Sequence, residues 1–193
     1  FLNLSANSFE TAPMPDFSSL QNLTYLYLYS CNLIGEIPYW ITQKTNLLHL
    51  DLHNNSFDAN SFPDFSLLVN LEELNLGACN IQGQIPSWIP QLSKLSTLQL
   101  CDNKLSGTIP ANFQNLSFLS DLCLARNLLC GSIPSEIGNI SLLNKLDLRG
   151  NLLTGEIPSS IGNLLGLWWL MLSDNMLTGS IPSEIGNLSQ LGI

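Results

Sequence analysis

The sequence predicts a solenoid of the α/β type, in which one short unit is stacked many times and a parallel β-sheet lines one side of the coil. Three observations predict it. A 24-residue pattern recurs along the chain without insertion or deletion. Each copy holds one short segment in which apolar residues alternate, as they do in a strand. Glycine and proline then recur at fixed places in most copies, which disfavours long helices.

The repeat is clearest from Leu143 to Gly166, where it reads L-x-x-L-x-L-x-x-N-x-L-x-G-x-I-P-x-x-I-x-x-L-x-x. Full copies begin at Leu23, Leu47, Leu71, Leu95, Leu119, Leu143 and Leu167, and partial copies occupy 1–22 and 191–193. We predict one solenoid domain over 1–193. Because both ends fall within a copy and neither carries a polar cap, we expect the chain to be a fragment of a longer protein.

Composition limits the classes of protein to which the chain can belong. Hydrophobic residues make up 45 % of the chain and charged residues 11 %, which fits a leucine core under a surface of uncharged polar groups. The formal charge of -9 argues against nucleic acid as a partner. No run of eighteen apolar residues is present, so we expect membrane attachment only through parts outside this segment. Five cysteines, an odd number, form no disulfide framework, and we expect all of them to be unpaired.

The fixed letters have architectural roles. Positions 4 and 6 of each copy face the core, so positions 3, 5, 7 and 8 face outward on the concave wall. Asparagine at position 9 is expected to bond backbone groups where the chain leaves the strand. Cys31 and Cys79 replace it in two copies as small weak donors. Glycine at position 13 permits a tight bend, and proline at position 16 fixes an extended backbone.

The segment after the asparagine stands as LIGEIP, IQGQIP, LSGTIP, LCGSIP, LTGEIP and LTGSIP. With this L-x-G-x-I-P turn, the chain resembles the plant-specific class of leucine-rich repeats. The resemblance implies a right-handed superhelix with a parallel concave β-sheet, short second strands and 3-10 or irregular convex segments. It also implies the extracellular domain of a receptor-like kinase or receptor-like protein, or a secreted polygalacturonase inhibitor. The SCNL and ACNI variants look most like receptor-like proteins.

Two copies depart from this pattern. Copy one, NSFETAPMPDFSSLQN, and copy three, NSFDANSFPDFSLLVN, lack the glycine and carry proline one position later, at Pro15 and Pro63. Copies two and four share a cysteine and a tryptophan, so the N-terminal half looks like a duplicated 48-residue pair. The second strand is therefore in question in copies one and three.

Aromatic residues mark the first candidate site on the concave wall. Three tyrosines project from one strand and two histidines, separated by an aspartate, from the next; they are Tyr25, Tyr27, Tyr29, His49, Asp51 and His53. Tyrosine supplies contact area with a polar tip, which interfaces favour, but rings that only cover the sheet would give the same pattern. His49-x-Asp51-x-His53 resembles a zinc-ligand set, yet alternate strand residues lie about 6–7 Å apart. We expect no metal, and favour a solvated, pH-sensitive patch.

Charged residues and a tryptophan mark a second candidate. Arg126, Lys145 and Arg149 alternate with aspartates and could receive a carboxylate or an acidic sugar, or could merely neutralise those aspartates across strands. Trp169 marks either a further contact or a cover for the next copy. Six N-x-[ST] sequons predict a secreted glycoprotein; they begin at Asn3, Asn22, Asn54, Asn115, Asn139 and Asn187.

The sequence contains no recognisable nucleophile and base pair, phosphate loop or carboxylate dyad, so we predict neither an enzyme nor a cofactor. We predict a recognition module of a plant receptor-like protein or kinase in defence or developmental signalling, on the extracellular side of the plasma membrane or in the apoplast. Its expected partners are a peptide, pathogen-derived or protein ligand, with a co-receptor in addition. The alternatives are a secreted inhibitor resembling those of polygalacturonase, and a purely structural role.

Overall fold

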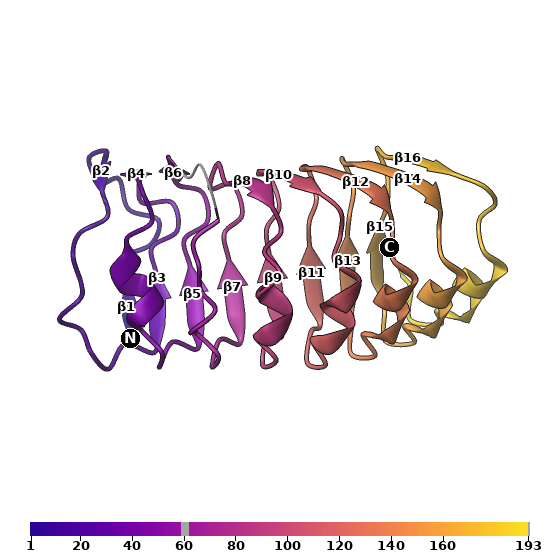
Figure 1. The fold of residues 1–193 in the computed structure, drawn as a ribbon, viewed down its shortest axis with the longest axis horizontal. Helices are drawn as coiled ribbons and strands as arrows, with labels where there is room; N and C mark the ends of the chain where they lie inside the picture. The colour runs from indigo at the N-terminus through magenta and orange to yellow at the C-terminus, as the bar shows by residue number, and fades with distance from the viewer. Residues whose placement is uncertain (59–61, 193) are drawn as a thin grey trace.

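The computed structural model is an arc of stacked coils, with the N-terminus at one end of the row and the C-terminus at the other (Figure 1). It describes residues 1–58 and 62–192. Residues 59–61, in copy three, and residue 193, at the end of the last partial copy, lie outside the described chain. The fold class predicted from the sequence is confirmed.

One parallel sheet lines the inner side of the arc. In the described residues it has eight strands: β1 (Leu2–Asn3), β3 (Tyr25–Tyr27), β5 (His49–Asp51), β7 (Glu73–Asn75), β9 (Thr97–Gln99), β11 (Asp121–Cys123), β13 (Lys145–Asp147) and β15 (Trp169–Met171). Leu26 pairs with Leu50, and Leu50 with Leu74, so the same position of each copy stands beside its counterpart. These leucines are fully buried, whereas the residues on either side of them face the concave wall.

A second set of strands runs along one rim. Three of them form one sheet, β2 (Ala12–Pro13), β4 (Leu33–Gly35) and β6 (Ser56–Phe57). Five form another, β8 (Gln82–Gln84), β10 (Lys104–Gly107), β12 (Leu128–Ser132), β14 (Leu152–Glu156) and β16 (Met176–Thr178). The second strand therefore forms in copies one and three as well, but only over two residues each. Both of these short strands pair with β4, which supplies the register that their own turns do not specify.

The convex side carries single turns of 3-10 helix. These are η1 (Tyr39–Gln43), η2 (Ile89–Gln91), η3 (Ala111–Asn115), η4 (Ser135–Asn139), η5 (Ser159–Asn163) and η6 (Ser183–Asn187). Proline precedes most of them; Pro134, for example, is extended at φ -66° and ψ 138° immediately before η4. The glycine three residues before it, Gly131, has φ 77°, a left-handed conformation that residues with a side chain disfavour. Together they turn the chain sharply from the rim to the convex side.

Buried asparagines hold successive copies together. The Oδ1 atom of Asn103 accepts the backbone N–H groups of Cys79 and Ile81 in the preceding copy, at 3.1 and 2.9 Å. Its Nδ2 donates to the carbonyls of Leu76 and Leu100, at 2.7 and 3.1 Å. Asn55, Asn127, Asn151 and Asn175 repeat this arrangement in whole or in part. The role predicted for position 9 is confirmed.

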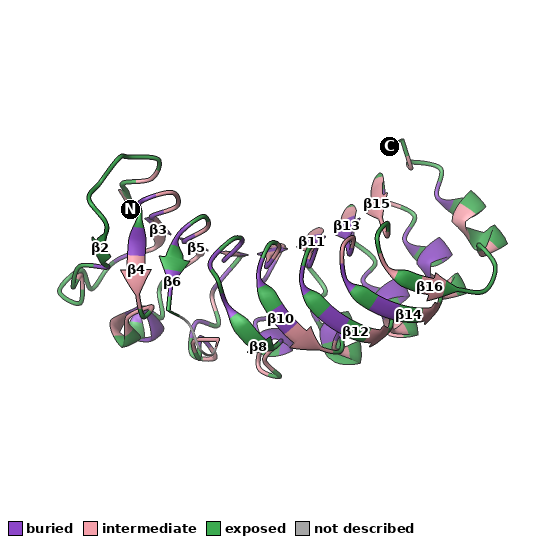
Figure 2. Cartoon of the chain, turned by 90° about the horizontal axis from the view of Figure 1, so that it is seen from above, coloured by how far each residue is buried: buried purple, intermediate pink, exposed green. Residues whose placement is uncertain are grey.

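Cysteine replaces this asparagine with a partial equivalent. The Cys31 thiol donates to the Leu4 carbonyl and the Cys79 thiol to the Leu52 carbonyl, both at 3.2 Å. All five cysteines of the chain are free. The apolar core is continuous through the arc, and the exposed residues lie along the rims, the convex turns and the two ends (Figure 2). In the described part of the chain, no helix has the length and apolar character needed to cross a bilayer.

Candidate functional site

The aromatic side chains of the concave wall meet on neighbouring strands. Tyr25 on β3 stands opposite His49 on β5, and their ring centroids lie 4.8 Å apart. The Tyr29 and His53 rings stack at 4.6 Å, with an interplanar angle of 11°. All of these rings are half-buried, so they contact one another and still reach the surface. We call the five side chains the aromatic patch: Tyr25, Tyr27, Tyr29, His49 and His53.

Two oxygen atoms converge on one nitrogen of His49. Tyr27 Oη lies 2.9 Å from His49 Nδ1, and Glu73 Oε2 lies 2.8 Å from the same atom. We infer that Nδ1 carries a proton and donates it to Glu73, because an unprotonated nitrogen would oppose its lone pair to those of the carboxylate. Glu72 Oε2 adds a second carboxylate 3.8 Å from His49 Nε2.

Neither glutamate was among the site residues predicted from the sequence. Glu73 occupies the same position of its copy as His49, and the two residues are paired in the sheet. That shared position is the signal that would have identified it.

The second histidine points toward a different carboxylate. His53 Nδ1 lies 2.7 Å from Asp51 Oδ1, and Asp51 is only 6 % exposed. The two histidines therefore contact different carboxylates, and His53 Nδ1 also lies 3.1 Å from Asn75 Nδ2 of the next copy. In the described residues no three His, Cys, Asp or Glu side chains are grouped as metal ligands.

The environment of Tyr27 shows that the electrostatic potential at the patch is negative. Partial burial raises the pKa of the Tyr27 hydroxyl, and the negative charges of Glu73 and Asp51 raise it further. Both effects disfavour a tyrosinate anion. The patch is therefore partly desolvated and electronegative.

The three cations predicted as site residues each lie beside an aspartate. Arg126 Nη1 lies 3.3 Å from Asp102, Lys145 Nζ 3.3 Å from Asp121, and Arg149 Nε 3.3 Å from Asp147. Opposite charges at these distances neutralise one another, and at exposed positions they contribute little to stability. This part of the concave wall is polar but close to neutral.

Trp169 borders a recess of about 240 Å³ on the same wall. Its ring lies 5.9 Å from that of Trp168, and Lys145 Nζ stands 5.1 Å from the centre of the Trp168 ring. Burial raises the pKa of the Asp147 carboxyl despite a backbone hydrogen bond and the guanidinium of Arg149. The recess is lined by Gln99, Asp121, Cys123, Lys145, Asp147, Trp168 and Trp169. The structure thus brings Lys145 and Trp169 together and leaves Arg126 outside this recess.

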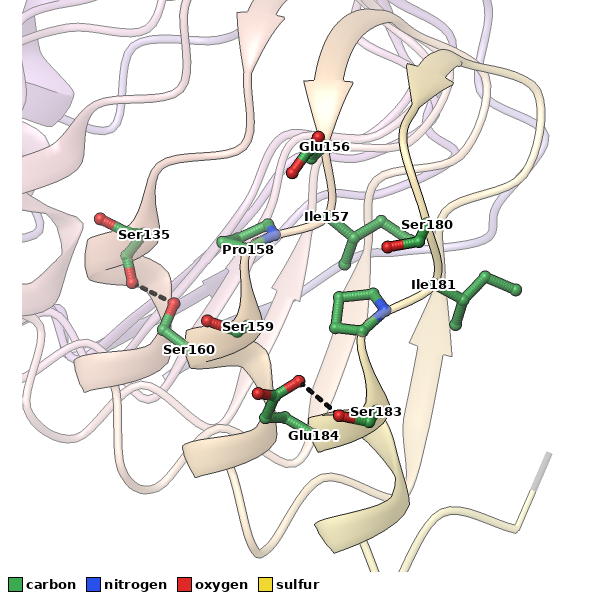
Figure 3. Close-up of a pocket in the computed structure, with 11 residues that line it drawn as sticks. Ser135, Glu156, Ile157, Pro158, Ser159, Ser160, Ser180, Ile181, Ser183 and Glu184 are labelled. Atoms are coloured by element: carbon green, nitrogen blue, oxygen red, sulfur yellow. Dashed lines mark hydrogen bonds between the residues drawn. The ribbon is translucent and has the colours of Figure 1, made fainter.

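A larger recess, about 650 Å³, lies away from the concave wall (Figure 3). It is formed by the turns that lead into η4, η5 and η6, and its polar groups are mainly serine hydroxyls with Glu156 and Glu184. Ile181 is 79 % exposed here, whereas Ile133, at the same position two copies earlier, is 3 % exposed. The difference arises because Ile181 has a neighbouring copy on one side only. This recess is an open face of the repeat, and it contains none of the predicted binding residues.

The sequons fall into two groups. Asn115, Asn139 and Asn187 are the exposed last residues of η3, η4 and η6, on the convex side, and Asn22 is exposed in a turn. Asn3 and Asn54 lie on the concave side, and the Asn54 amide donates to Ser30 Oγ at 2.8 Å. Only the second group lies near the aromatic patch.

Comparison with known proteins agrees with this geometry. Residues 1–187 match the family model described as the LRR domain of the EGF-like domain-containing protein ComC. No curated protein sequence matches the chain.

Solved structures give closer parallels. The LRR ectodomain of the Arabidopsis thaliana membrane receptor kinase GASSHO1/SCHENGEN3, in complex with CASPARIAN STRIP INTEGRITY FACTOR 2, is 38 % identical with a TM-score of 0.90, over 98 % of this chain and 23 % of that one. The Arabidopsis receptor kinase HAESA, in complex with the peptide hormone IDA and the co-receptor SERK1, is 33 % identical with a TM-score of 0.92. This match covers 99 % of this chain and 32 % of that one. An LRR protein of Leptospira interrogans is 34 % identical with a TM-score of 0.82, over 98 % of this chain and 46 % of that one. The chain thus spans less than a third of either plant protein.

Proposed function

Because this chain belongs to the leucine-rich repeat family, we propose that it is a ligand-recognition segment of a plant receptor ectodomain and binds a peptide or protein through its concave face. The aromatic patch is the observation that carries the proposal. Its rings lie on the exposed side of β3 and β5 and fill no part of the leucine core. Aromatic side chains with polar tips are the anchors that protein interfaces favour.

The resemblance to plant receptor kinase ectodomains supports the proposal, since two of those ectodomains are in complex with a ligand. By the same analogy, the whole protein would act in defence or developmental signalling, and a co-receptor would bind with the ligand. Arg126, Lys145, Arg149 and Trp169 would extend the contact toward the C-terminal half. Binding, and not catalysis, is the activity that this surface favours.

An extracellular location follows from the same proposal. Asn115, Asn139 and Asn187 would then carry glycans, because they are exposed on the convex side, where a glycan leaves the concave wall open. A glycan on Asn54 would instead compete with a ligand at the aromatic patch. Glycopeptide mass spectrometry on protein secreted from plant cells would report which sequons are occupied.

The alternative is a secreted inhibitor resembling those of polygalacturonase. The sequence that follows this segment in its gene distinguishes the two. A transmembrane segment favours the receptor, whereas a cap followed by a stop codon favours the inhibitor.

The binding proposal can be tested without knowing the natural ligand. A random library of displayed twelve-residue peptides is panned against the full-length ectodomain, and against a variant with Tyr25→Ala, Tyr27→Ala and Tyr29→Ala. We expect the triple variant to lose the enriched peptides. Tyr39→Ala is the matched control, because Tyr39 is 76 % exposed on η1 and lies off the concave wall. Equal enrichment on the wild type and the triple variant would contradict the proposed site.

A further inference from the structure

The aromatic patch differs in charge from the rest of the concave wall. Asp51, Glu72 and Glu73 border it, and their ion pairs in the described residues are with His49 and His53 alone. With neutral histidines, three negative charges remain without a permanent cation. In the C-terminal half, by contrast, the two arginines and Lys145 each stand beside an aspartate.

Lys94 lies on the surface next to Glu72 but forms its hydrogen bond with another residue. Lys94 and Glu72 both line one recess, but the Lys94 ammonium donates to Asn70 Oδ1 at 2.8 Å. Glu73 has its contact with His49, which also faces the tyrosines. In the described residues, none of these three carboxylates forms an ion pair with a lysine or an arginine.

The tyrosine rings provide the second half of a cation site. Tyr25 and Tyr27 have centroids 6.5 Å apart with their planes tilted by 30°, and the Phe1 ring lies 5.6 and 5.7 Å from them. A cation is attracted to the face of an aromatic ring within about 6 Å of its centroid. Rings with this spacing can be reached together by one ammonium or guanidinium group, with Glu73 close by.

The local field has the sign that such a group needs. The pKa of the Tyr27 hydroxyl is raised by partial burial and by the negative charges of Glu73 and Asp51, so both carboxylates act on the rings. A carboxylate or phosphate brought to the same place would be repelled. A neutral ligand would gain the ring contact but nothing from the three carboxylates.

From the rings and from carboxylates that have no permanent cation beside them, we propose that the aromatic patch receives a basic side chain, arginine or lysine, of a peptide ligand. The guanidinium or ammonium group lies over Tyr25 and Tyr27 and is paired with Glu73, while Glu72 and Asp51 add long-range attraction. This inference rests on the proposed function and specifies the ligand chemistry of the same surface. It predicts electropositive ligands for this half of the wall and places no such demand on the C-terminal half.

The test uses three fluorescently labelled synthetic peptides of equal length, with a central tri-arginine, tri-citrulline or tri-glutamate segment. Binding to the full-length ectodomain is measured by fluorescence polarisation at two salt concentrations. Citrulline keeps the shape and most hydrogen bonds of arginine but has no charge. We expect the arginine peptide to bind at least tenfold more tightly than the citrulline peptide, and its affinity to fall with salt.

Paired variants separate the patch from net charge. Glu72→Gln with Glu73→Gln should weaken the arginine peptide about tenfold. Glu156→Gln with Glu184→Gln removes the same charge at the recess of Figure 3, away from the concave wall. This control should change the affinity for the arginine peptide less than twofold. Circular dichroism checks that each variant is folded. Equal binding of the citrulline peptide, tighter binding of the glutamate peptide, or an equal loss in both variants would overturn the inference.

These outcomes remain distinguishable from failure of the binding proposal itself. If library panning yields tyrosine-dependent peptides that are neutral or acidic, the concave face binds ligands but the cation preference is wrong. If panning yields no tyrosine-dependent peptide, the proposed function fails at this surface.

Discussion

Replacing Asn103 with alanine should lower the free energy of unfolding by about 3 kcal/mol. Asn103 is 8 % exposed, and its Oδ1 accepts two backbone N–H groups, those of Cys79 and Ile81. Alanine leaves both groups buried without an acceptor, at a cost of about 1–3 kcal/mol each. The carbonyls of Leu76 and Leu100 lose a donor as well, but each can still accept from another group. The costs of the two N–H groups add to about 2–6 kcal/mol. Because the structure relaxes around the smaller side chain, we expect a value toward the lower end of this range.

Urea unfolding followed by far-UV circular dichroism measures this loss, with the slope checked because repeat arrays can unfold in more than one step. Asn112→Ala, at an exposed position of η3, is the control and should change the unfolding free energy by less than about 0.5 kcal/mol. Asn103→Cys should fall between the two, because a thiol keeps a donor, as Cys79 does toward Leu52, but replaces the acceptor poorly. If Asn103→Ala costs no more than Asn112→Ala, the reasoning about these hydrogen bonds is refuted.

Two further predictions concern glycine and cysteine. Gly138 and Gly186 occupy the same position of copies six and eight, but an added Cβ would lie 2.2 Å from the Ser160 carbonyl oxygen at the first and within 4 Å of nothing at the second. Gly138→Ala should therefore lower Tm by several degrees while Gly186→Ala does not, and equal melting curves would count against this geometry. In the native protein at pH 8, iodoacetamide should alkylate exposed Cys130 and spare Cys79, because burial raises the pKa of the Cys79 thiol to about 12 and leaves about one molecule in ten thousand as thiolate. Peptide mass spectrometry checks this, and native labelling of Cys79 would contradict it.

The architecture could be predicted because each fixed letter of the repeat has one structural task. The 24-residue register places Tyr25 beside His49, and the alternation of the strand turns both outward; the structure agrees. The bonding role of Asn103 also followed, because a turn inside a solenoid leaves buried backbone groups that need a partner. Short rim strands in copies one and three were harder to predict, since β4 and not their own sequence supplies the pairing.

The details of the site depend on geometry that the repeat pattern does not contain. Asp51 and Asp147 occupy outward positions of the strand and are nevertheless buried, at 6 % and 8 % exposed. The sequence pattern placed His49 on one face of its strand with Asp51 and His53, but it did not show that the His49 ring contacts Glu73 on the next strand. Side-chain rotamers and ring contacts decide which carboxylate the His49 ring contacts. A period of 24 residues fixes only which backbone segments are adjacent.

The asparagine hydrogen bonds run in one direction along the chain. The amide of Asn55 closes the turn of the copy before it, through the N–H of Leu33 and the carbonyl of Leu28, and Asn103 does the same for the copy that contains Cys79. The turn of one copy is therefore stabilised by a side chain of the copy that follows it. Force applied at the C-terminal end should unfold the copies one after another, because each copy that unfolds removes the hydrogen bonds that stabilise the turn of the copy before it. Force applied at the N-terminal end would instead act on turns whose hydrogen bonds are still intact.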